Sequence, residues 1–238
     1  MRFDILTLFP QLCDTVLSES IIGRARKSGA ISVNLYNIRD YANNKHNRVD
    51  DTPYGGGKGM LIAAPPVVAC HDAVLSDRDD PCRPESVYTV YLSPKGTVLD
   101  QKVAKRLASY DRLVLICGHY EGIDQRAIDL IVDEEISIGD FVLTGGEIPA
   151  CIVVDAVARL QPGVLAGDEC FEIESFSDGR LEYPQYTRPY DFRGYTVPDV
   201  LLSGNHAEID KWRREQSDKL TAERRPDIMG DASRPAKK

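Results

Sequence analysis

The sequence predicts an α/β fold in which a parallel sheet carries helices on both faces, followed by a small all-helical C-terminal domain. Through residues 1–162, short β-rich runs alternate with stretches of helical spacing, as they do when helices connect parallel strands. Val87–Leu92 and Leu113–Cys117 are continuously apolar, which is typical of strands buried on both faces. After Gln161-Pro162-Gly163 the alternation stops, so a different kind of structure begins there.

Each element follows from a local pattern of apolar residues and from the residues that start or end helices and strands. The expected strands are Phe3–Leu8, Ile31–Ile38, Val87–Leu92, Leu113–Cys117 and Asp133–Ile138. The expected helices of the sheet domain are a stretch around Gln11–Lys27 that stops at Gly29, then Val98–Ser109 and Glu147–Leu160. Two short charged helices, His206–Gln216 and Asp218–Arg225, are expected before Pro226.

Three domain assignments follow from these elements. Residues 1–162 form the sheet domain. Residues 163–180, with Gly163, Gly167, Gly179 and several acids, have no sustained period and are expected to be a flexible interdomain linker. Residues 181–238 form the helical C-terminal domain.

Composition restricts the class of protein. The 238 residues are 42% hydrophobic and 28% charged, which is ordinary for a globular chain. No run approaches the roughly 18 apolar residues of a membrane helix, and the N-terminus lacks a signal-peptide core, so a cytoplasmic protein is expected. The six cysteines include no C-x-x-C pair and the four histidines are scattered, so no metal site is expected and most cysteines should be buried thiols.

The charge is unevenly distributed along the chain. A net charge of −8 argues against a protein that coats nucleic acid by charge alone. Residues 181–238 hold 11 Lys and Arg against 10 Asp and Glu, a balance of +1, whereas residues 1–180 hold 18 against 27, a balance of −9. Any contact with a polyanion should therefore involve the C-terminal part and the clusters Arg24–Lys27 and Lys45–Arg48, although ordinary surface charge is an equally good interpretation.

Three segments that follow predicted strands are candidates for a binding site. They are Tyr91–Pro94, Cys117–Asp124 and Ser137–Glu147, two of them rich in glycine. Ligands bind at the carboxyl ends of parallel strands, and glycine allows the backbone to approach them closely. Together the loops could cup a flat uncharged group such as adenine, or their glycines could simply cap helices and tighten turns.

Phosphate-binding motifs do not fit. Lys58 is followed by Gly59, so no G-x-x-x-x-G-K-[ST] motif exists, and no G-x-G-x-x-G opens a helix with an acid about 20 residues later. Tyr54–Met60 could form an anion-binding nest with a basic tip, or a flexible surface loop.

Taken in order, these motifs carry a resemblance. Tyr54–Met60, Tyr91–Pro94, Gly118–Asp124, Ser137–Glu147 and Tyr186-Thr187-Arg188-Pro189 with Leu202–His206 resemble the bacterial tRNA (guanine-N1)-methyltransferase family of the SPOUT class. The match runs from the first strand to about Met229. It implies S-adenosylmethionine as methyl donor, a deep trefoil knot in the sheet domain, and a homodimer whose active sites are shared between subunits. It further implies tRNA as substrate, methylated on the guanine immediately 3′ of the anticodon.

The resemblance also implies site residues. The implied cofactor-binding residues are Tyr91, Leu92, Ser93, Pro94, Gly118, Tyr120, Ser137, Ile138, Gly139, Asp140, Phe141, Val142, Leu143, Gly145 and Gly146. Glu121, Glu182 and Arg188 are the implied substrate-binding residues. Arg159 matches an arginine that stabilises the guanine O6.

Glu174 is the implied general base, and it departs from the family pattern. The family usually has aspartate there, so this carboxylate stands one methylene farther from the backbone. Removing the N1 proton of guanine requires a base within hydrogen-bonding reach, and Asp178 or Glu172 could also provide it. Glu121 could accept from both N1–H and N2–H, which selects guanine over adenine.

Other functions stay open at this stage. A similar knotted core could methylate another RNA atom, such as a ribose 2′-hydroxyl, and a non-catalytic tRNA-binding scaffold could keep the fold. Such a scaffold would be expected to lose Arg159 and the linker acids, which this chain retains. An oxidoreductase is the most distant alternative. A divalent ion could assist, although the sequence shows no ligand cluster for one.

Overall fold

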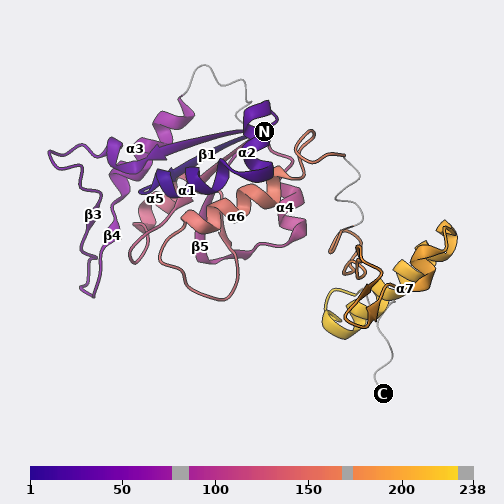
Figure 1. Cartoon of the computed structure of the whole chain (residues 1–238). Helices are drawn as coiled ribbons and strands as arrows, with labels where there is room; N and C mark the ends of the chain where they lie inside the picture. The colour runs from indigo at the N-terminus through magenta and orange to yellow at the C-terminus, as the bar shows by residue number, and fades with distance from the viewer. Residues whose placement is uncertain (77–85, 168–173, 230–238) are drawn as a thin grey trace. The chain divides into compact units, whose positions relative to one another are not determined.

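Five parallel strands form the centre of the first part of the chain. In the computed structural model (Figure 1), which describes residues 1–76, 86–167 and 174–229, these strands follow one another across the sheet in the order β2-β1-β6-β5-β7. They are β1 Arg2–Thr7, β2 Ser32–Asn37, β5 Val87–Val98, β6 Arg112–Cys117 and β7 Glu134–Ser137. Every neighbouring pair is parallel, which confirms the predicted sheet.

Helices cover both faces of this sheet, as expected. Side chains of β1 alternate between two apolar clusters, because Phe3 and Ile5 belong to one and Leu6 to the other. The first cluster includes residues of α1 Pro10–Leu17, α2 Ser20–Ser28, α4 Gln101–Leu107 and α6 Glu147–Ala158. The second includes residues of α3 Ala64–Leu75 and α5 Gln125–Ile131. A sheet buried on both sides explains why its strands are continuously apolar.

Shorter elements complete this part of the chain. A 3₁₀ turn, η1, covers Ile38–Tyr41, and β3 Asp50–Asp51 pairs antiparallel with β4 Leu61–Ile62. Neither this pair nor the helices α3 and α5 were predicted from the sequence. The α3 helix begins at Ala64-Pro65-Pro66, and prolines at the first helical positions are compatible with a helix start although they resemble a turn signal.

The predicted helical stretch around Gln11–Lys27 is wrong in one respect. It forms two helices, α1 and α2, separated at Ser18 and Glu19, and Ser20 has a positive φ of 53°. The predicted stop at Gly29 is confirmed, since this residue caps α2 in the left-handed conformation at φ 78°.

The helix predicted over Val98–Ser109 is also too long. It begins only at Gln101, because β5 continues to Val98 after an irregularity between Leu92 and Thr97. A Cβ atom on Gly96 would lie 2.3 Å from the Glu135 backbone, so glycine allows β5 to run closely against β7 here.

The chain divides into two compact units, Met1–Ala166 and Gly167–Lys238. In the second unit, Leu181 is tied to α7 (His206–Arg224) by two hydrogen bonds: its N–H donates to Thr221 Oγ1 at 2.9 Å and its carbonyl accepts from Ser217 Oγ at 2.6 Å. The Arg180 guanidinium pairs with Asp218 at 2.5 Å and with Asp178 at 2.9 Å. These contacts fix the segment that follows residue 174 onto the helix.

Two expectations for this unit are corrected. The two predicted C-terminal helices are one helix, α7, because the sequence between them contains no helix breaker. Ser217, which stands between the two predicted helices, does not end the helix, and its hydroxyl donates to the Leu181 carbonyl. The unit is not all-helical: beside the 3₁₀ turn η3 Asp199–Leu202 it contains the hairpin of β8 Asp191–Phe192 and β9 Tyr195–Thr196. Residues 168–173 of the predicted linker, which include the alternative base Glu172, lie outside the described residues.

Four cysteines, Cys13, Cys70, Cys117 and Cys151, are buried and not disulfide-bonded, as expected, while Cys82 and Cys170 lie outside the described residues. None of the helices that the structure describes is both long and apolar enough to span a membrane.

Candidate active site

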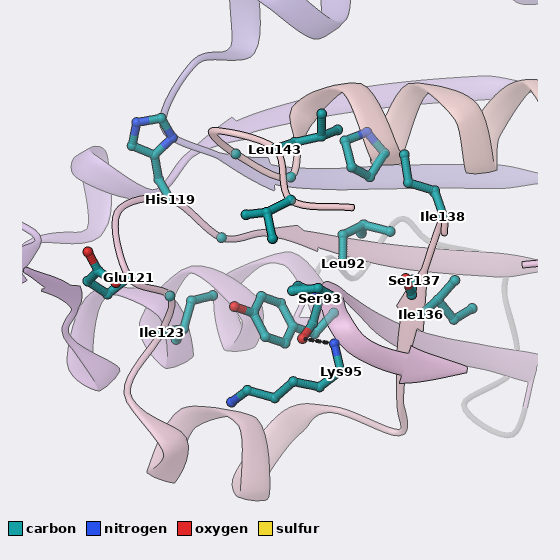
Figure 2. A pocket seen from close by; sticks show the side chains of 18 of the residues that line it. Leu92, Ser93, Lys95, His119, Glu121, Ile123, Ile136, Ser137, Ile138 and Leu143 are labelled. Atoms are coloured by element: carbon teal, nitrogen blue, oxygen red, sulfur yellow. Dashed lines mark hydrogen bonds between the residues drawn. The ribbon is translucent and has the colours of Figure 1, made fainter. Parts of the chain in front are cut away.

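A pocket of about 440 Å³ lies beside the carboxyl ends of β6 and β7 and the middle of β5, where that strand is irregular between Leu92 and Thr97. Tyr91–Pro94, predicted to follow a strand, therefore lies within β5. Its walls come from this part of β5 and from the segments that follow β6 and β7. Figure 2 shows His119 and Glu121 at one end of the pocket and Ser137 and Ile138 at the other. The volume suits a nucleoside-sized ligand, which is the kind of group that open α/β sheets bind at this edge.

The floor of the pocket is formed by Tyr91 and the backbone of Gly118. A Cβ atom on Gly118 would lie 2.7 Å from the Tyr91 hydroxyl, so any side chain there would press on the tyrosine or fill the pocket. Tyr91 is only 6% exposed. Burial, reinforced by the charge of Glu135, raises the pKa of Tyr91 to about 12, although a hydrogen bond with the Ile123 backbone opposes this. The hydroxyl is therefore neutral across the physiological range of pH.

Gly145 and Gly146 join the loop after β7 to the end of β6. The Gly146 N–H donates to the Gly118 carbonyl at 2.8 Å, and Gly145 forms a bridge with His119. A Cβ atom on Gly146 would lie 2.8 Å from the Cys117 Cα, which is backbone and cannot move aside cheaply. The glycine is thus required for two chain segments to cross closely at the pocket.

A buried carboxylate supports this crossing. Glu147 starts α6, is 4% exposed, and accepts a hydrogen bond from Thr7 Oγ1 at 2.7 Å. An acid in the first turn also interacts favourably with the helix dipole. Thr7 and Glu147 therefore fasten the segment after β7 to the end of β1.

The β3–β4 pair closes the Glu121 end of the pocket. The Glu121 N–H donates to the Met60 carbonyl at 3.1 Å, the Ile62 N–H donates to Gly122 at 2.9 Å, and Asp124 donates back to Ile62 at 2.9 Å. Tyr54–Met60, considered as an anion nest or a surface loop, forms most of the turn between these strands. Its Tyr54 side chain is 99% exposed.

The structure brings most of the predicted cofactor residues around this one pocket. The predicted residues that line it are Tyr91, Leu92, Ser93, Pro94, Gly118, Tyr120, Ser137, Ile138, Gly139, Phe141, Val142, Leu143, Gly145 and Gly146. Asp140 is exposed and does not line it. Glu121, a predicted substrate residue, does.

Sequence reasoning missed several lining residues. His119, Gly122 and Ile123 lie inside the predicted segment Cys117–Asp124, so assigning every residue of that segment to the site would have found them. Leu61 and Gln125 belong to elements that were not predicted, β4 and α5, and carried no signal.

The remaining predicted residues lie elsewhere. Arg159 caps the C-terminal end of α6. Glu174 and Glu182 line a second pocket, of about 260 Å³, within the second unit, together with the alternative base Asp178. This pocket also contains Arg213, whose guanidinium lies 5.1 Å from the centroid of the Tyr183 ring. Arg188 is exposed in the same unit.

The two basic clusters of the first unit differ in the partners of their charged side chains. Within Arg24–Lys27, Arg26 pairs with Asp14 at 3.1 Å, whereas Arg24 and Lys27 are exposed. The Lys45–Arg48 residues are all exposed, although Arg48 Nε donates to the Asp50 carbonyl at 2.9 Å. Within the described part of the chain, no group of three or more His, Cys, Asp or Glu side chains is placed to hold a metal ion.

Comparison with known proteins gives a consistent result. The family model described as tRNA (Guanine-1)-methyltransferase TrmD matches residues 1–231. The tRNA (guanine-N(1)-)-methyltransferase of Alkaliphilus oremlandii (strain OhILAs) is 55% identical over 231 residues, which cover 97% of this chain and 93% of the relative. Proteins of the same name from Ruminiclostridium cellulolyticum and Clostridioides difficile are 54% and 53% identical over 96% of this chain, covering 96% and 97% of their own lengths.

Proposed function

The chain belongs to the tRNA (guanine-1)-methyltransferase family, and from that premise we propose that it methylates N1 of the guanine immediately 3′ of the anticodon in tRNA, with S-adenosylmethionine as donor. The observation that carries this proposal is the pocket of about 440 Å³ formed by the irregular middle part of β5 and by the segments that follow β6 and β7. A tRNA substrate is consistent with a cytoplasmic location.

The pocket fits the cofactor chemically. Its lining is mostly backbone and apolar side chains such as Leu92, Ile138 and Leu143, which suits a neutral adenine ring. The space above Gly118 exists only because that residue lacks a side chain. When bound, S-adenosylmethionine supplies an electrophilic methyl group on a sulfonium that also serves as leaving group. Tyr91–Pro94, Gly118 and Ile138–Leu143 would hold it.

The protein must then activate the guanine. N1 carries a weakly acidic proton and becomes a good nucleophile only when that proton leaves, so a carboxylate base contributes directly to the rate. We assign this role to Glu174, a half-buried side chain beside Asp178 and Glu182. Its extra methylene, relative to aspartate, lengthens its reach.

Two further side chains complete the assignment. As the proton leaves, negative charge develops on O6, and a guanidinium stabilises it because the donor is fixed in advance. Arg159, at the end of α6, is assigned this role. Glu121, on the pocket rim, accepts from the exocyclic N2–H of guanine, a donor that adenine lacks. Glu182 and Arg188 are assigned to tRNA binding.

A homodimer is supported by an apolar surface on two adjacent helices. The α1 and α6 helices pack together and lie side by side in Figure 1. Five large apolar side chains of this helix pair and the residue before it are between 40% and 53% exposed: Phe9, Leu12, Val16, Ile148 and Ile152. Contiguous exposed apolar residues mark protein interfaces. Phe9 also contacts the His119 ring at a centroid distance of 5.0 Å, so the surface reaches the pocket. We infer that a second copy covers it and that the active site is shared between subunits.

We also infer that the chain forms a deep trefoil knot. The strand order places β5 between β6 and β7, yet the segment after β7 returns to the end of β6, where Gly146 bonds to Gly118. That segment must therefore cross the end of β5. Knots are very rare in proteins, and this crossing is the observation that supports the inference.

The function has a direct test. The protein is incubated with labelled S-adenosylmethionine and unmodified tRNA transcript, the RNA is digested, and the methylated nucleoside is identified by mass spectrometry. The expected product is 1-methylguanosine at the position after the anticodon. A 2′-O-methyl nucleoside would support the alternative chemistry, and no product would point to a tRNA-binding scaffold; either result contradicts the proposal.

A further inference from the structure

The β8–β9 hairpin presents two aromatic rings to solvent. Phe192 and Tyr195 form a cross-strand pair, and their side chains are 61% and 83% exposed. Neighbouring aromatic rings across a hairpin stabilise it modestly. Rings exposed to this degree bury little surface within the chain, so packing within the second unit does not explain why they are aromatic.

The tip of this hairpin holds an arginine beside one of the rings. Arg193 and Gly194 have φ angles of 56° and 86°, the left-handed values of a tight hairpin turn, and the Gly194 N–H donates to Asp191 Oδ1 at 2.9 Å. Asparagine or glycine usually takes the first of these positions, and arginine does so only at some conformational cost. The guanidinium carbon of Arg193 lies 5.4 Å from the centroid of the Phe192 ring, which is within cation–π range.

The hairpin is anchored at its base. The Val197 N–H donates to the Tyr190 carbonyl at 3.0 Å, and the Tyr190 hydroxyl donates to Asp199 Oδ1 at 3.2 Å. The first bond joins the two flanks of the hairpin, and the second ties the hairpin to η3. The exposed rings are therefore presented on an ordered support rather than on a free loop.

The size and charge of the exposed surface indicate whether its partner is a protein or a nucleic acid. Two side chains on two-residue strands offer far less than the roughly 800 Å² per partner of a stable protein interface. Flat rings next to a guanidinium are instead the chemistry that binds unpaired nucleobases, by stacking and by contact with phosphate. Residues 186–197 contain Arg188 and Arg193 against Asp191, a net charge of +1 in a chain of −8.

We propose that this aromatic hairpin, Asp191–Thr196, binds an unpaired nucleobase of the tRNA, which stacks on Phe192 or Tyr195 while Arg193 contacts a phosphate. The inference rests on the proposed function, because it takes tRNA as the substrate. It adds a recognition site to the second unit that is separate from Glu174 and Glu182. It also assigns a role to a segment whose residues carry no part of the chemistry.

The experiment measures the affinity of the full-length protein for unmodified tRNA transcript. Base stacking on an aromatic side chain is worth about 5- to 150-fold in affinity. Tyr195→Ser or Phe192→Ser should therefore weaken tRNA binding by about that factor, and Tyr195→Phe should bind within about threefold of wild type. Leu202→Ser is the matched control, since Leu202 lies in the same unit and is also 61% exposed. It should leave the affinity unchanged.

Three readouts separate this inference from other outcomes. Calorimetry with S-adenosylmethionine and thermal unfolding should be the same for all variants. A fully paired RNA duplex of similar length should not distinguish the serine variants from wild type, because its bases cannot stack on a side chain. Sedimentation should show an unchanged oligomeric state. Unchanged tRNA affinity in both serine variants, equal losses on the duplex, or dissociation of the oligomer would each overturn the proposal. Product analysis of the wild type reports separately on the proposed function.

Discussion

The pocket of the first unit is formed largely by backbone, whereas the surface of the second unit is formed by side chains. Around the pocket, Gly118 and Gly146 allow close approach of backbone segments, and Tyr91 is buried and neutral. In the second unit the corresponding groups are charged and aromatic side chains, such as Glu174, Arg188 and Phe192, which are half-buried or exposed. A backbone-built pocket tolerates little added volume, whereas a side-chain surface depends on particular functional groups. The two regions should therefore fail in different ways.

The largest expected effect is on turnover, at Glu174. A general base typically contributes about 10²- to 10⁴-fold in rate, so Glu174→Gln should reduce single-turnover methylation by that factor while tRNA and cofactor binding stay nearly unchanged. Raising the pH should partly rescue the variant, because guanine that is already ionised needs no base. Asp178→Asn is the control, since Asp178 lines the same pocket and pairs with Arg180. Full activity of Glu174→Gln would transfer the role to Asp178 or Glu172.

The next effect is on cofactor binding, at Gly118. In Gly118→Val the new side chain must either displace the Tyr91 hydroxyl, 2.7 Å from the Cβ position, or enter the pocket. Overpacking of this kind costs about 1–3 kcal/mol, so affinity for S-adenosylmethionine should fall by about 5- to 150-fold. Calorimetry measures the affinity, and circular dichroism shows whether the fold is kept. A well-folded variant with wild-type affinity would show that the cofactor binds elsewhere.

A smaller effect is expected on tRNA affinity, at Arg188. This side chain is exposed, and as a phosphate contact it should be worth a few-fold in affinity. Arg188→Ala should weaken tRNA binding about 5- to 10-fold at low salt and reduce the slope of log affinity against log salt by about one. Cofactor affinity should not change. An unaltered salt slope would remove Arg188 from the phosphate contacts.

The smallest effect concerns the pH dependence of stability in the first unit. His71 in α3 is buried and close to Thr89, and burial lowers its pKa from 6.5 despite the opposing influence of Asp72. The folded state therefore binds fewer protons than the unfolded state, so the free energy of unfolding should decrease as the pH falls below about 6.5. Urea unfolding of His71→Gln across this range should show a shallower decrease. An identical slope in the variant would assign the acid sensitivity to other groups.

The sheet and the edge at which the pocket lies could be predicted from local sequence, whereas the individual cofactor residues came from the resemblance. Apolar runs such as Leu113–Cys117 identify buried strands, and the edge where ligands bind follows from parallel pairing. The ends of elements were less predictable. The extension of β5 to Val98 depends on pairing with β7. The break between α1 and α2 depends on the positive φ of Ser20 and on the close approach of Gly23 to the Ser18 carbonyl.

The second unit was harder to predict for a physical reason. Its hairpin strands are two residues long, too short to show a period, and its turn contains Arg-Gly rather than a common turn pair. The roles of Arg159 and Glu174 came from resemblance alone, because a single arginine or glutamate has no pattern in sequence. Chemistry that depends on isolated side chains leaves little local signal.

The central claim is that pocket and base meet from different subunits, and mixed dimers test it most directly. At an S-adenosylmethionine concentration that saturates only the wild-type pocket, Gly118→Val and Glu174→Gln homodimers should each be nearly inactive. In a heterodimer of the two variants, one site combines both defects and the other combines an intact pocket with an intact Glu174. Methylation by purified, verified heterodimers should therefore recover to about half the wild-type rate per dimer. Heterodimers that stay as inactive as the two parents would show that each chain supplies its own base.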